Sequence, residues 1–151
     1  MLTLDSKKTL LVATLVGAVA AIPVHADAQV APKIPLEKLQ SMFANMRAQT
    51  PWNIDGPLLW GYFFIDADRT RLDAAAATLK DKGYRVVGIA KVDGHDLFRL
   101  HVERVEVQTP DSLYARDIEL EALARKLHIG SYDGMDVGPP PAAAGRGAPQ
   151  D

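Results

Sequence analysis

The chain has 151 residues, with 17 lysines and arginines against 19 aspartates and glutamates and a formal net charge of −2. This mild acidity argues against proteins that bind nucleic acid or anionic membranes, because both classes need a strongly basic surface. There is no cysteine, which excludes disulfide bonds, thiol catalysis and thiolate zinc sites.

Residues 1–28 are typical of a secretory signal peptide. Lys7 and Lys8 precede an uncharged run over 9–22, and small residues suited to cleavage stand at Ala26 and Ala28. This run is shorter than the about 20 apolar residues of a membrane-spanning helix. We expect cleavage after Ala26 or Ala28 and a soluble periplasmic protein that is free of the membrane. The alternative is an uncleaved anchor or a buried helix.

Residues 29–57 are predicted to form a helix followed by a loop. Pro35 suits the first turn of a helix, and apolar residues recur at helical spacing from Leu36 to Met46. The helix is expected to end at Thr50 and Pro51. In the loop that follows, Trp52 is a candidate exposed anchor for a partner.

A strand, a helix and a second strand are predicted next. The apolar run 58–65 predicts a buried strand. The alanine-rich helix that follows has Asp68 as its N-cap and Gly83 just beyond its end. Residues 84–92 are rich in β-branched side chains and predict the second strand.

The second strand is expected to turn at Asp93-Gly94 into a third strand that starts at Asp96. Apolar residues alternate there with Arg99, His101 and Glu103, which predicts one polar face. The alternation slips beyond this point, which predicts a bulge near Glu103-Arg104. The Thr109-Pro110-Asp111 motif starts a long helix that Gly130 is expected to end, and 131–137 is the last strand.

The order β-α-β-β-α-β over 58–137 predicts an α+β, ferredoxin-like fold with an additional N-terminal helix. We expect this extra helix to cover the second face of the sheet, because the first two strands are apolar on both sides. Residues 138–151 are rich in Pro, Gly and Ala and predict a disordered tail.

The region 58–137 resembles the domain of the regulators of ribonuclease E activity B (RraB). The resemblance depends on the aromatic strand 60–64, the helix that ends at Gly83-Tyr84, the Asp-Gly hairpin, and Tyr132-Asp133-Gly134 after the last helix. Met135 stands where that family usually has tryptophan, and the acidic tracts of its cytoplasmic members are missing. The resemblance implies a small non-catalytic protein that binds another protein and restrains it.

Two groups of residues are candidates for partner binding. Trp60 and Tyr62 lie on one face of the first strand, where they form either a core or an apolar patch left for a partner. Tyr132, Asp133, Gly134, Met135 and Asp136 form either a turn or a recognition segment. Both alternatives stay open for each group.

No catalytic or cofactor motif is present in the sequence, and the histidines are too dispersed to predict a metal site. Asp133 and Asp136 lack the other ligands of a calcium loop. A hydrolase that uses either aspartate with His101 ranks last among the hypotheses. RNA binding is not expected, because the third strand lacks the RRM pattern.

These observations predict a periplasmic protein that binds a protein partner without catalysis, needs no cofactor and contacts no nucleic acid directly. Its most concrete form is an immunity protein that neutralises a secreted antibacterial effector toxin. The alternative is a regulator of ribonuclease E. The partner, the binding face and the oligomeric state are not predicted.

Overall fold

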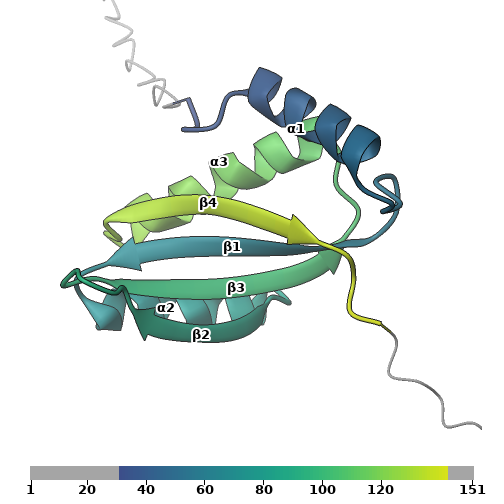
Figure 1. The fold of residues 1–151 in the computed structure, drawn as a ribbon. Coiled ribbons are helices and arrows are strands. Elements are labelled where there is room, and N and C mark those ends of the chain that lie inside the picture. The colour runs from purple at the N-terminus through teal and green to yellow at the C-terminus, as the bar shows by residue number, and fades with distance from the viewer. Residues whose placement is uncertain (1–30, 143–151) are drawn as a thin grey trace, which may run out of the picture.

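The computed structural model describes residues 31–142, so the predicted leader 1–28 and residues 143–151 of the predicted tail lie outside it. The four strands form one antiparallel sheet in the order β2-β3-β1-β4, which confirms the ferredoxin-like α+β prediction (Figure 1). The elements are α1 (Leu36–Gln49), β1 (Leu58–Asp66), α2 (Arg69–Asp81), β2 (Arg85–Lys91), β3 (Phe98–Glu106), α3 (Pro110–Lys126) and β4 (Ser131–Gly138).

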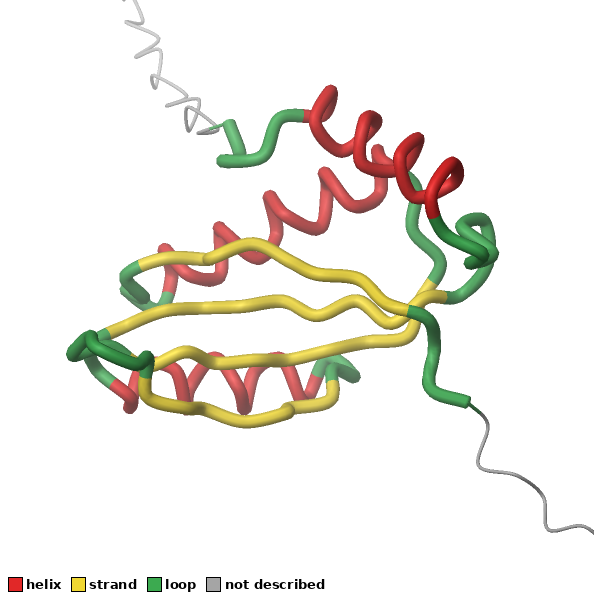
Figure 2. Tube along the Cα trace, in the orientation of Figure 1, coloured by secondary structure: helices red, strands yellow, loops and turns green. Residues whose placement is uncertain are grey.

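The helices leave one face of the sheet uncovered. Helices α2 and α3 pack behind the strands, and α1 lies against α3 near the β4 edge (Figures 1 and 2). The expectation that α1 covers the second face is therefore wrong. Its apolar stripe points to the helix side, where the ring of Phe43 stacks on that of Trp60 with centroids 5.8 Å apart.

The predicted helix caps are largely confirmed. Asp68 accepts a hydrogen bond from the Thr70 amide, and Thr109 forms a capping box with Ser112. Gly83 has a φ of +90° just beyond α2, as expected. The end of α3 differs from the prediction that Gly130 ends this helix, because His128, with a φ of +55°, is the residue that takes the left-handed conformation there.

The core lies between the sheet and the helices. Trp60, Tyr62 and Phe64 alternate along β1 toward the helices and are completely buried. Leu72 and Leu79 of α2 and Leu113 and Leu120 of α3 are the facing aliphatic side chains. This single layer of contacts is what holds the sheet rigid and leaves its other face free to present side chains.

The predicted bulge near Glu103-Arg104 is wrong. Strand β3 pairs with β1 without interruption, and the irregularities lie instead at Val87 in β2 and opposite Phe63 in β4. The slip in the pattern has another cause. Polar side chains of β3 point toward the helices there because a polar network receives them.

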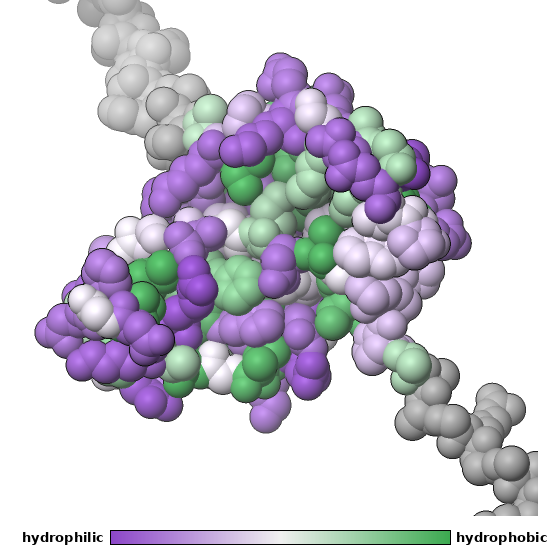
Figure 3. All heavy atoms as spheres, in the orientation of Figure 1, coloured by the Kyte–Doolittle hydropathy of each residue, from purple (hydrophilic) through white to green (hydrophobic). Residues whose placement is uncertain are grey.

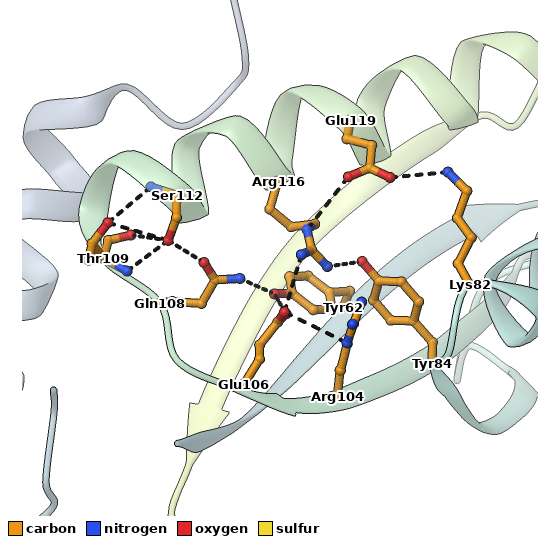
Figure 4. Close-up of polar contacts among 10 residues, drawn as sticks. All are labelled: Tyr62, Lys82, Tyr84, Arg104, Glu106, Gln108, Thr109, Ser112, Arg116 and Glu119. Atoms are coloured by element: carbon orange, nitrogen blue, oxygen red, sulfur yellow. Dashed lines mark hydrogen bonds and ion pairs between the residues drawn. The ribbon is translucent and has the colours of Figure 1, made fainter. Parts of the chain in front are cut away.

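Figure 4 shows this network between β3, α3 and the start of β2. The Tyr62 hydroxyl donates to Glu106 Oε1 at 3.0 Å, and Arg116 Nη2 donates to Glu106 Oε2 at 3.1 Å. Arg116 also donates to the Tyr84 hydroxyl. The Gln108 side chain continues the network from Tyr62 to the first turn of α3. Each charged group here has a partner, so we assign the network to stability.

The hairpin between β2 and β3 is wider than the Asp93-Gly94 motif alone indicates. Gly94 has the expected positive φ, of +72°, but the Val92 amide donates a hydrogen bond to the Leu97 carbonyl and β3 begins at Phe98.

In residues 31–142, no helix combines the length and apolar character needed to cross a bilayer.

Candidate functional site

The face of the sheet that the helices leave uncovered, called the open face below, is the candidate functional surface (Figure 1). In a sheet, residues that pair across antiparallel strands point to the same side. The open face therefore carries Leu59, Gly61, Phe63 and Ile65 of β1 opposite Val105, Glu103, His101 and Arg99 of β3. Figure 3, seen from this side, shows apolar patches separated by hydrophilic side chains.

An aromatic pair lies near the middle of the open face. The rings of Phe63 and His101 stack with centroids 4.5 Å apart and planes inclined by 22°. The Arg99 guanidinium lies 5.2 Å from the Phe63 centroid, within cation–π range. Both strands are held rigidly by their ladder, so this flat, partly apolar surface is already formed before any partner arrives.

The structure also brings together His101 and Asp136, two residues that the last-ranked hydrolase hypothesis combined without any evidence that they are close. Both side chains extend over Gly61, where a Cβ would lie 2.9 Å from His101 Nε2 and closer still to Asp136 Oδ1. Any larger residue at this position would displace them. Glycine therefore serves here to let two side chains from neighbouring strands cross β1.

Partial burial lowers the pKa of His101 below its usual value. The positive charges of Arg85 and Arg99 lower the pKa further, and the carboxylate of Asp136 opposes them. The imidazole is therefore neutral near pH 7. Its Nε2 atom is buried without a hydrogen-bond partner and lies 3.8 Å from Glu103 Oε2.

Two ion pairs lie on the open face. Arg99 Nη2 lies 2.9 Å from Asp133 Oδ2, and Arg85 pairs with the nearly buried Glu103. No group of three or more potential metal ligands occurs within residues 31–142. Stacked rings, paired charges and apolar patches are the components of a recognition surface.

Three of the predicted partner-binding residues are core residues instead. Trp60 and Tyr62 are completely buried and Tyr132 is 3% exposed, so none offers a surface to a partner. Tyr62 donates to Glu106, and Tyr132 donates to Asp117 at 2.7 Å. Of the two alternatives for the aromatic face of β1, the structural one is correct, because the helices cover it.

The other predicted residues divide between two environments. Asp133, Gly134 and Asp136 belong to the open-face side of β4, where the bulge and the pairing with β1 place them. Met135 pairs with Tyr62 and packs against the core, and Trp52 is half-buried against it. The segment is a strand rather than a turn, with Gly134 at a φ of +94° in its bulge.

The residue that the site prediction missed is Phe63. The alternation of β3 had correctly predicted that Arg99, His101 and Glu103 share a polar face. The same alternation in β1 separates Phe63 from the buried aromatics, but only the strand order shows that it lies beside His101.

Comparison with known families decides what kind of domain this is. The family model described as regulator of ribonuclease activity B matches residues 36–137. The chain belongs to the RraB family. No curated protein is similar enough to count as a match.

Membership in the RraB family confirms the resemblance noted in the sequence and extends it. The match takes in α1, which the sequence had set apart from the domain. Its packing on α3 and Trp60 agrees with this, since α1 completes the helix side of the core. The family description is that of a regulator, which supports a protein-binding role without catalysis.

Proposed function

We propose that this RraB-family domain regulates a ribonuclease by binding it through the open face, without turning over a substrate. Family membership supports the ribonuclease as the partner class. The carrying observation is the open face itself, a rigid surface where Phe63, His101 and Arg99 meet on the side without helices. Aromatic and arginine side chains contribute most of the binding energy in many protein interfaces.

A cleavage assay tests the proposal. Purified ribonuclease E cuts a fluorogenic single-stranded RNA while the domain is titrated in, and the RNA is also incubated with the domain alone. We expect cleavage to fall to a plateau at a fixed molar ratio, with the RNA intact in the absence of the enzyme. Cleavage unchanged at a large excess of domain would contradict the proposal.

Matched arginine variants locate the binding face. Arg99→Ala removes an exposed guanidinium paired with Asp133 on the open face, and Arg69→Ala removes one paired with Asp73 on α2. The two side chains are similarly exposed, at 50% and 57%. We expect Arg99→Ala to weaken binding about tenfold or more, as for a central arginine, and Arg69→Ala to leave it unchanged. The reverse order would place the partner on the helix side.

The second proposal concerns the compartment, because the leader-like residues 1–28 favour export. An exported form would act in the periplasm on an exported partner, and an immunity protein against a secreted effector toxin is its concrete version. Fractionation of cells producing the full chain, with mass spectrometry of the N-terminus, tests it. A mature chain that begins at Asp27 or Gln29 supports export. Uncleaved protein in the cytoplasm would reject it and leave the cytoplasmic ribonuclease as the partner.

A further inference from the structure

Strand β2 is an edge strand whose outer backbone is unpaired within the described part of the chain. It neighbours β3 alone, and no other segment of residues 31–142 bonds its backbone. The opposite edge differs, because Lys33 Nζ donates to the Tyr132 carbonyl at 3.4 Å and the Ile34 side chain approaches Gly134. A free edge is a template for pairing with another strand.

A trough of about 500 Å³ runs beside this edge on the open face. Its wall is β2 from Val87 to Lys91, and its floor includes Phe63, Arg99 and His101. The trough exists because Gly88 is small, with no atom within 4 Å of where its Cβ would stand. Its volume is within the range of pockets that hold small molecules or protruding side chains.

The trough and the edge suit one ligand geometry. In a strand added to the outer side of β2, alternate side chains would point to the open face, and one opposite Gly88 would reach over this residue, which has no side chain, toward the trough. Val87, which is 47% exposed, provides an apolar contact at its rim. An apolar side chain over Gly88 would contact His101, which pairs with Gly88 and stacks on Phe63. These contacts favour an extended segment with alternating apolar residues.

The charges around the trough indicate what the remaining side chains of such a segment would be. Lys91 and Arg99 line it against the single carboxylate of Asp93. Their present partners are Asp96, which is 99% exposed, and Asp133, which is 36% exposed. Exposed pairs of this kind contribute only about 0–1 kcal/mol, so a carboxylate from a partner can replace them.

We propose that β2 and its trough bind an extended acidic segment of a protein partner as an added strand, with one apolar side chain above Gly88. The inference deepens the proposed function, because it names the element of the partner that the open face recognises. It also assigns β2, rather than β4, as the recognition edge.

A defined peptide tests the inference without knowledge of the natural partner. The probe is a fluorescent seven-residue peptide of alternating valine and glutamate with blocked ends, titrated with the domain by anisotropy. Its first control has lysine in place of glutamate, and its second carries N-methyl groups on alternate amides, which cannot complete a ladder. We expect the glutamate peptide to bind at least tenfold more tightly than either control. Equal binding of the three peptides, or no binding of any of them at millimolar concentration, would overturn the inference.

Two variants of the domain connect the binding to the trough. Gly88→Leu fills the trough, and Gly138→Leu is its control at β4, where a Cβ also meets no atom within 4 Å. Lys91→Glu reverses the charge, with Lys80→Glu on α2 as its control. We expect Gly88→Leu and Lys91→Glu each to lose affinity for the glutamate peptide tenfold or more, and the two control variants to keep it. Circular dichroism checks that each variant is folded. The bound glutamate peptide should also slow the hydrogen exchange of the β2 amides, which charge attraction alone would not do.

The same variants separate this inference from the proposed function. If wild-type domain inhibits ribonuclease E and Gly88→Leu inhibits it equally well, the trough is not the recognition site, while the regulatory role stands. If the domain binds the peptide through the trough but never inhibits the enzyme, the added-strand mode stands and the partner class is wrong. Preferential binding of a single-stranded RNA in place of the peptide would overturn the inference.

Discussion

Asp117 of α3 makes a sharp prediction about pH, because it is an acid with no exposed surface in the core. Its Oδ1 accepts a hydrogen bond from the Tyr132 hydroxyl at 2.7 Å, and its Oδ2 has no partner. The pKa of Asp117 is raised from 3.8 to about 6. Burial is the main cause, and the nearby charge of Glu121 adds to it, whereas the hydrogen bond from Tyr132 lowers the pKa. We predict that Asp117→Asn removes a pH-dependent loss of stability.

The sign follows from proton binding. The folded state holds a proton on Asp117 between pH 3.8 and about 6, and the unfolded chain does not. This contribution to stability is full below pH 3.8 and is lost as the pH rises toward 6. One pKa unit corresponds to about 1.4 kcal/mol, so the loss amounts to about 3 kcal/mol by neutral pH.

Urea denaturation from pH 3.5 to 8 measures the effect. The free energy of unfolding of Asp117→Asn minus that of the wild type should rise by about 2.5 kcal/mol between pH 4 and 7. Subtraction removes the titration of all other groups, and the fixed cost of an unpartnered amide cancels from the slope. A flat difference for Asp117→Asn would refute the assignment of a protonated core acid.

Two further predictions concern stability and are checked by the same denaturation experiment at pH 7. Arg116→Met should destabilise the domain by about 2–3 kcal/mol, because Glu106 loses its closest cation. Arg116→Lys should recover only part of this lost stability, since one ammonium cannot reach both Glu106 and Tyr84. His128→Gly should stabilise by about 1 kcal/mol and Gly83→Ala should destabilise by a similar amount, because both positions are left-handed. A change of the same sign at both positions would show that φ does not control these helix ends.

The parts of the fold that the sequence predicted are those determined by a few neighbouring residues. Asp68 caps α2 through an amide two positions away, and Gly83 ends that helix through its own φ. The strands and helices follow from periodicities that need no distant information. His128 was missed because the left-handed position usually takes glycine, and Gly130 lay nearby. Here the backbone hydrogen bonds of Ile129 and His128 to the end of α3 hold the histidine in place.

The predictions that failed depended on residues far apart in the chain. Arg104 and Glu106 looked like a slipped strand, because nothing in β3 indicates that Arg116 and Tyr62 would pair with Glu106 across the core. The binding residues chosen from aromatic content were Trp60 and Tyr62, which α1 and α3 bury. Composition identifies large side chains, but the strand order and helix placement decide which face they occupy.

The proposed binding surface is a sheet face that no helix of residues 31–142 covers (Figure 1). A bare apolar sheet face favours aggregation, but on this face the charged pairs Arg99–Asp133 and Arg85–Glu103 lie among the apolar side chains (Figure 3). These pairs keep the face hydrated, and a partner that supplies its own carboxylate can exchange with them at little cost. The neutral His101 beside Phe63 adds a flat surface that requires no such exchange. Affinity on this face should therefore depend both on the apolar surface around Phe63 and on the exposed charges of Lys91 and Arg99, and it should weaken as salt increases.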